Sequence, residues 1–128
     1  MLGAGALLRL GAAIVLLGSR IAPAAADKLD GAELFRRACA ACHASEKNAP
    51  PRQGPNLFGV YGRMAGTAAG FSYSAGFLAG SRGIVWNAAS LDRWLVNPQA
   101  MMPGVVMPYK QPKPERRAAV IEYLKTLK

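Results

Sequence analysis

One pentapeptide constrains this chain more than any other feature: Cys39-Ala40-Ala41-Cys42-His43. A C-x-x-C-H run attaches haem, because its two thiols add to the two vinyl groups and the adjacent imidazole takes one axial position on the iron. Two thiols at this spacing on a helical turn reach both vinyls, and the next residue then faces the iron. The motif predicts one haem c per chain, attached covalently through Cys39 and Cys42, with His43 as an iron ligand.

Paired cysteines also serve other chemistries. A thioredoxin-like redox pair needs strands alternating with helices around it, and no such pattern is visible here. A structural zinc site takes four ligands, and the whole chain holds two Cys and one His, so a carboxylate would have to supply the fourth. A disulfide between Cys39 and Cys42 would close too small a loop to stabilise much. Haem attachment is therefore the favoured interpretation.

The first residues have the composition of a targeting segment. Arg9 provides a positive start, residues 10–17 are an apolar stretch, and Ala24-Ala25-Ala26 is a small-residue cleavage signal. We expect a signal peptide over residues 1–26, cut after Ala26, and one exported domain over residues 27–128 in the periplasm.

An uncleaved membrane anchor that faces the periplasm is the alternative. A spanning helix needs roughly 20 apolar residues, and Arg9 and Arg20 interrupt the apolar run. Export also fits the cysteines, since one haem motif uses both and leaves no odd thiol. The sequence thus favours the cleaved leader.

The chain is basic, with a formal net charge of +9. Removing the leader leaves 102 residues and lowers the charge to +7, because Arg9 and Arg20 are lost. A basic excess suits nucleic acid, an anionic membrane or an acidic protein partner. Lys and Arg form no dense run, so we expect no nucleic acid. We expect a monomer that meets acidic redox partners and touches membrane surfaces only transiently.

Helical patterns dominate the mature chain. Residues 27–43 predict an amphipathic helix, with Asp30 and Glu33 as a capping box. Residues 87–97 predict a second helix and residues 114–125 a third. Five prolines in residues 98–114 predict irregular structure there. The predicted fold class is all-α, with long loops.

The iron's second axial ligand has few sources, because His43 is the chain's one histidine. The options for this position are a thioether, another side chain, or an open or water-filled site. Of Met64, Met101, Met102 and Met107, the last lies between Pro103 and Pro108 in a stiff loop that can hold a sulfur at fixed depth. Met107 is the predicted ligand. His/Met ligation raises the haem potential and fills both axial positions, which suits single-electron transfer.

Together these features resemble the class I c-type cytochromes, especially the mitochondrial-like soluble bacterial ones. The resemblance covers residues 31–125 and implies the small cytochrome c fold, with three main helices, short ones and long loops wrapped around one haem. Beside the C-x-x-C-H motif, its most specific segments are Gly54-Pro55-Asn56-Leu57, Gly62-Arg63 with Gly66, Gly70-Phe71-Ser72-Tyr73-Ser74, Gly83-Ile84-Val85-Trp86, and Pro103-Gly104 through Met107.

The resemblance also implies roles for residues outside the motif. Pro55 would offer its carbonyl to the Nδ1–H of His43, which fixes the ring. A buried haem propionate would accept hydrogen bonds from Arg63, Tyr73 and Trp86, which offsets the cost of placing a carboxylate in an apolar pocket. Gly31 and Phe35 would pack against the last helix.

The implied function is a periplasmic electron carrier, not an enzyme. It would pass one electron at its exposed haem edge between a membrane or periplasmic donor and a terminal acceptor. The implied partners are a quinol–cytochrome c oxidoreductase, a terminal oxidase or a dehydrogenase of the respiratory chain. Several lysines that ring this edge in the mitochondrial proteins are replaced here, by Ala38, Gln99, Ala100 and Val106.

Two alternatives remain open at this stage. The chain could be a dedicated haem subunit of a periplasmic dehydrogenase complex. It could also be a haem enzyme or sensor in which Met107 is displaceable, although no second histidine exists to act as a distal acid or base.

Overall fold

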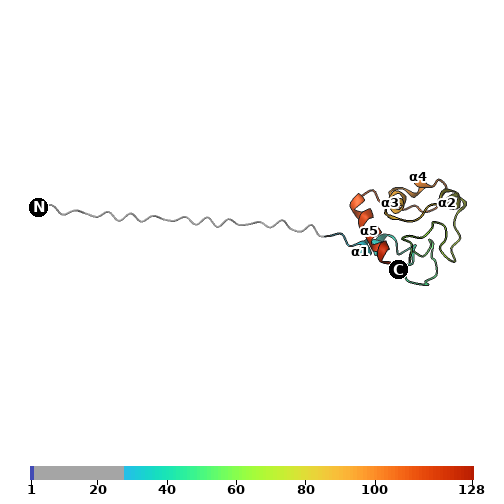
Figure 1. The fold of residues 1–128 in the computed structure, drawn as a ribbon, viewed down its shortest axis with the longest axis horizontal. Helices are drawn as coiled ribbons and strands as arrows, with labels where there is room; N and C mark the ends of the chain where they lie inside the picture. The colour runs from blue at the N-terminus through green and yellow to red at the C-terminus, as the bar shows by residue number, and fades with distance from the viewer. Residues whose placement is uncertain (2–27) are drawn as a thin grey trace.

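The computed structural model describes Met1 and residues 28–128. The predicted leader and its cleavage site at Ala26 lie outside the described residues, except for Met1. Residues 28–128 form no β-strand, and their one isolated bridge joins Met64 and Val85. Their helices are α1 (Gly31–Ala38), α2 (Ala75–Gly80), α3 (Ala88–Val96), α4 (Pro98–Met101) and α5 (Pro114–Thr126) (Figure 1).

The helix α1 leads directly into the cysteine motif. The Asp30 carboxylate caps it by accepting hydrogen bonds from the backbone N–H groups of Ala32, at 2.9 Å, and Glu33, at 3.3 Å. The helix is shorter than the predicted 27–43, because the N–H groups of Cys42 and His43 both turn back to the carbonyl of Cys39. The motif therefore lies in turns after α1, and not within a helix.

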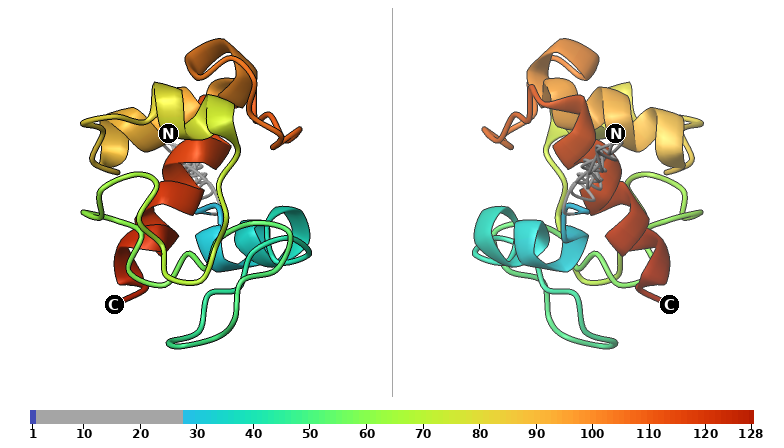
Figure 2. Two further views of the ribbon diagram at one scale, coloured as in Figure 1. Left: turned by 90° about the vertical axis from the view of Figure 1, so that its right-hand side faces the viewer. Right: turned by 90° about the vertical axis from the view of Figure 1, so that its left-hand side faces the viewer.

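Helices α1 and α5 pack across each other, as Figures 1 and 2 show. A Cβ atom on Gly31 would lie 2.9 Å from the Cβ of Tyr123, so a larger residue would force the helices apart. The ring of Phe35 packs on that of Tyr123 with centroids 5.2 Å apart. The predicted contact between Gly31, Phe35 and the last helix is confirmed.

Asparagines begin both α3 and α4. The Asn87 side chain accepts from the N–H of Ser90, whose hydroxyl accepts from the N–H of Asn87, a reciprocal capping box. Asn97 ends α3 and caps α4, with the buried Pro98 at its first position. The prediction of irregular structure throughout residues 98–114 is therefore wrong for its first turn.

Helix α5 begins at Pro114, as predicted, and buries Val120, Ile121 and Leu124. It also buries Arg117, which the sequence did not single out. The Arg117 guanidinium donates to the carboxylate of Asp92 on α3 at 2.7 Å and to the backbone carbonyls of two loop residues, Gln111 and Pro112. These hydrogen bonds hold the end of the proline-rich segment against α3 and α5.

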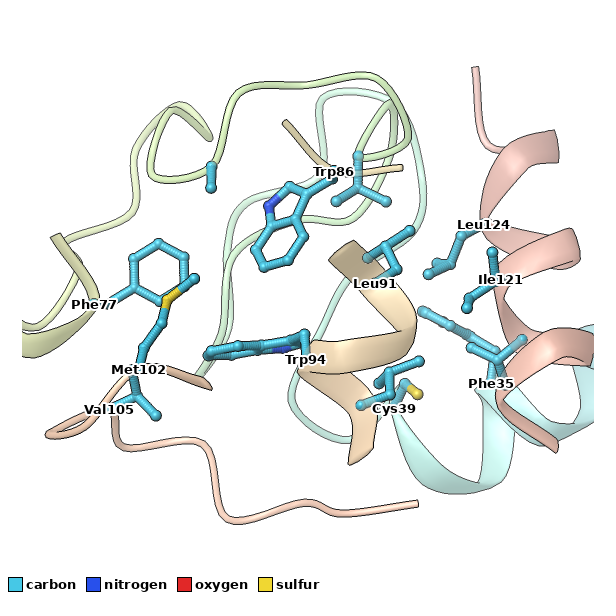
Figure 3. Packing of buried hydrophobic residues seen from close by; sticks show 14 residues of the cluster. Phe35, Cys39, Phe77, Trp86, Leu91, Trp94, Met102, Val105, Ile121 and Leu124 are labelled. Atoms are coloured by element: carbon cyan, nitrogen blue, oxygen red, sulfur yellow. The ribbon is translucent and has the colours of Figure 1, made fainter. Parts of the chain in front are cut away.

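Aromatic rings form the centre of the core (Figure 3). The ring centroid of Trp94 lies 5.5 Å from that of Phe77 and 5.7 Å from that of Trp86. Figure 3 shows these three side chains facing one another, while Phe35 points from α1 toward α5, which carries Ile121 and Leu124. Among the described residues, none of the helices has the length and apolar character needed to cross a membrane.

Candidate cofactor site

The helices and loops enclose a cavity of about 580 Å³, within the roughly 300–1,000 Å³ typical of small-molecule and cofactor sites. Its walls are mostly apolar and come from α1, α3, α5 and the long loops. All of the site residues predicted from the sequence line it: Cys39, Cys42, His43, Pro55, Arg63, Tyr73, Trp86 and Met107.

The imidazole of His43 is fixed by its neighbours. Its Nδ1 lies 2.8 Å from the carbonyl oxygen of Pro55, and since a carbonyl only accepts, Nδ1 carries the proton. Nε2 is then free to bind a metal. Burial lowers the pKa of His43, while the bond to Pro55 raises it. A Cβ on Gly54 would lie 2.7 Å from Nδ1, so only glycine leaves room for the ring.

Both cysteines line the cavity, and neither forms a disulfide in the described structure. Burial, together with a smaller effect of the neighbouring Cys42, raises the pKa of the Cys39 thiol to about 11. The Sγ of Cys42 donates to the side-chain oxygen of Gln53 at 3.2 Å. Two thiols three residues apart, both facing one apolar cavity beside an imidazole, are the donor set that covalent haem attachment uses.

The guanidinium of Arg63 uses only part of its hydrogen-bonding capacity in the described structure. Its two terminal nitrogens donate to the backbone carbonyls of Phe58 and Asn56, each at 3.1 Å. Its Nε is buried and has no partner among the described residues. Burial lowers the pKa of Arg63, whereas the nearby Tyr73 raises it. An unpaired buried donor on a cavity wall matches an anionic group such as a propionate.

The hydroxyl of Tyr73 has its acceptor side occupied, because its oxygen accepts from the N–H of Ala68 at 3.1 Å. Its proton is left to donate to another group. The ring stacks on Phe77 with centroids 4.8 Å apart, which sets its direction. Trp86 is buried at 6% exposure and lines the same cavity.

Of the four candidate methionines, Met107 is the one that lines this cavity in the described chain. Met102 is completely buried in the core, and Met64 is 54% exposed. Met101 lies on a different, smaller hollow between α3 and α4. The structure therefore brings Met107 to the same enclosed space as the C-x-x-C-H motif.

Comparison with known proteins agrees with this geometry. The family model described as cytochrome c matches residues 29–128. The chain belongs to the cytochrome c family. Similar proteins include the cytochrome c of Chlamydomonas reinhardtii, 43% identical over 79% of this chain and 89% of that protein. The cytochrome c of Ginkgo biloba is 41% identical over 77% of this chain and 87% of that protein.

As a class I c-type cytochrome, the chain is an all-α, single-haem electron-transfer protein and not an enzyme. Its haem c is bound covalently through the cysteines of the motif, Cys39 and Cys42. The family, the fold class and the cofactor predicted from the sequence are thereby confirmed. The observed cavity fits this group in its size, its apolar walls and its unpaired Arg63 donor.

Two residues at the site were not predicted to act there. Gly54 makes room for His43, and Gln99 donates to the backbone carbonyl of Met107 at 2.6 Å. For Gly54, the available signal was a glycine directly before Pro55 in a loop. Nothing in the sequence pattern indicated the second.

Proposed function

We propose that this cytochrome is a periplasmic carrier that shuttles one electron between a membrane or periplasmic donor and a terminal acceptor. His43 and Met107 would bind its haem iron. The single observation that carries this proposal is the cavity lined by both residues and by the two thiols. Bound haem supplies an iron that gains and loses one electron between its ferric and ferrous states.

The residues of the chain would prepare the site in separate ways. The carbonyl of Pro55 holds His43 in the tautomer that presents Nε2, and Gly54 admits the ring. Arg63, Tyr73 and Trp86 would stabilise a propionate through their N–H and O–H groups. The aromatic core excludes water, so little solvent has to reorganise when the charge changes.

An acidic partner fits the surface charge. The excess of basic residues attracts acidic surfaces and speeds encounter. Two basic residues near the motif, Arg36 and Arg37, pair with Glu33. Beside Met107, Val106 is 77% exposed. Lys110 and Lys113 form no ion pair among the described residues. We therefore propose a docking area that combines an apolar centre with these two lysines, for a quinol–cytochrome c oxidoreductase, an oxidase or a dehydrogenase.

The proposed periplasmic location is based on the leader sequence, residues 1–26. The apolar stretch and the alanines before residue 27 support export and cleavage after Ala26. Fractionation of the native cells with intact-mass measurement tests this: the periplasmic fraction should contain a chain of residues 27–128 plus one haem. A membrane-bound chain that retains residues 1–26 would support the anchored alternative.

Carbon monoxide addition tests the carrier function against a haem enzyme or sensor. With Met107 on the iron, the ferrous protein should bind carbon monoxide very slowly. Rapid binding would show an open or displaceable position and would contradict the carrier. Purification as a stoichiometric complex with one dehydrogenase would instead identify a dedicated haem subunit.

A further inference from the structure

Gln99 lies in the single turn of α4, next to the loop that carries Met107. Its side-chain Nε2 donates a hydrogen bond to the backbone carbonyl of Met107 at 2.6 Å. We propose that Gln99 is a positioning residue, which holds Met107 at the depth where its thioether reaches the haem iron. This inference rests on the proposed function, because it takes Met107 as the axial ligand.

The orientation of the Gln99 amide is determined by its partner. A backbone carbonyl can only accept, so the amide nitrogen must face Met107. The other amide atom, Oε1, is buried and has no partner among the described residues. The side chain thus uses its donor and leaves its acceptor unpaired, although an unpaired buried acceptor has a desolvation cost. Its position is explained by the Met107 carbonyl and not by its own hydrogen-bonding needs.

The backbone that carries Gln99 is firmly held. The Asn97 side chain accepts from the N–H of Ala100 at 3.4 Å, and the N–H of Met101 donates to the carbonyl of Asn97 at 3.1 Å. Pro98 fixes the first helical position and is completely buried. The amide of Gln99 therefore extends from a rigid support.

The loop before Met107 starts in close contact with α2. A Cβ on Gly80 would lie 2.8 Å from Cγ of Met102, and a Cβ on Gly76 would lie 2.6 Å from the carbonyl of Gly104. These tight approaches hold the loop as far as Gly104. Beyond it Val105 is still buried, at 9% exposure, whereas Val106 is 77% exposed.

The Gln99 bond holds the part of the loop that α2 does not. The N–H of Val105 bonds to the carbonyl of Met102, and the N–H of Gln111 bonds to that of Leu95. Between these two attachments, over residues 106–110, the described structure gives the backbone one hydrogen bond, the one from Gln99 to Met107. The backbone position of Met107 therefore depends on Gln99.

This role has a kinetic consequence. An external ligand such as imidazole binds the ferric protein only while the Met107 sulfur is away from the iron. Without the Gln99 bond, Met107 moves more freely and spends more time displaced. The loss of one such hydrogen bond should increase the population of the displaced state about tenfold.

The test compares the wild-type holoprotein with Gln99→Leu and Gln111→Leu. The Gln111 amide donates to the Tyr109 hydroxyl at 3.0 Å, within the same loop and without contact to the Met107 backbone, so it is a matched control. We expect Gln99→Leu to weaken the sulfur-to-iron band of the ferric spectrum and to bind imidazole about tenfold faster. Gln111→Leu should change neither. Should Gln99→Leu fail to mature, Gln99→Asn keeps the amide, loses its reach and should behave in the same way.

The outcomes separate the inference from the proposed function. A wild-type protein that lacks the sulfur-to-iron band and binds imidazole at once would overturn both. A wild-type protein with the band, joined by a Gln99→Leu variant with the same band and imidazole rate, would overturn the positioning role alone. Guanidinium unfolding of each variant shows whether a faster rate merely reflects lower global stability, and an increase of the same size in both variants would also contradict the role.

Discussion

The Nδ1 atom of His43 lies 2.8 Å from the carbonyl oxygen of Pro55, and the preceding glycine makes this approach possible. A Cβ on Gly54 would lie 2.7 Å from the same nitrogen. The residue before Pro55 thus decides whether the imidazole can keep its place. In this way a loop without regular structure sets the direction of Nε2, the atom that would bind the iron under the proposed function.

Gly54→Ala should therefore disturb the iron site. The added methyl group overlaps the His43 ring, and relieving such overpacking costs roughly 1–3 kcal/mol. We expect a lower free energy of unfolding, measured with guanidinium, together with a changed ferric spectrum.

Gly83→Ala is the control for Gly54→Ala. Gly83 has φ +74°, so alanine is strained there, but its Cβ would meet nothing within 4 Å. It should lower stability by about 1 kcal/mol and leave the spectrum unchanged. If the two variants had the same spectrum as the wild type, the steric role of Gly54 would be wrong.

Arg63→Gln removes a half-buried positive charge and the two hydrogen bonds to Phe58 and Asn56. The loss should lower the free energy of unfolding by about 1–3 kcal/mol. It should also lower the midpoint potential, because a positive charge beside the haem favours the ferrous state. Potentiometric titration measures this change. Arg82→Gln removes the same charge from an exposed position and should shift the potential much less.

The stability of the holoprotein should fall in mild acid. Burial lowers the pKa of His43 in the folded chain, and iron bound at Nε2 would act in the same direction, while the unfolded chain takes up the proton near its ordinary pKa of 6.5. Stability should therefore be complete above about pH 6.5 and decrease as the pH falls below it. The guanidinium midpoint, measured from pH 8 to pH 5, tests this. A midpoint that rises on acidification would contradict the neutral, buried state of His43.

Electron exchange with an acidic partner should slow as salt is added, because ions screen the attraction between unlike surfaces. Lys110 and Lys113 form no ion pair among the described residues, whereas Lys125 pairs with Glu122. We expect the double variant Lys110→Gln, Lys113→Gln to reduce the second-order rate constant of electron exchange at low ionic strength. The reduction should be roughly several-fold, since the variant loses part of the electrostatic steering. Lys125→Gln is the matched control. A rate independent of salt in the wild type would remove the basis for steering.

The sequence predicted the elements whose signals are local. Asn87 begins α3 and Pro114 begins α5 because caps and fixed φ angles act over a few residues. The length of α1 was overestimated, since the cysteine motif turns back on the carbonyl of Cys39. Helix α4 was missed, because a single turn after Asn97 has too few residues to show a period.

The candidate site likewise has features that local sequence signals indicated and others that they did not. Short motifs indicated the residues that line the cavity, including His43 and Met107. The clash that a side chain at Gly54 would cause and the bond from Gln99 to Met107 depend on how irregular loops meet in space. Periodicity and motif spacing do not determine how loops pack against each other, so these contacts could be found only in the structure.

The ferric absorption spectrum and midpoint potential of Met107→Ala test the central claim most directly, with Met101→Ala as the control that stays outside the cavity. We predict that Met107→Ala loses the sulfur-to-iron band and has a lower potential, while Met101→Ala keeps both wild-type values. A Met107→Ala protein with an unchanged band and potential would show that another group binds the iron.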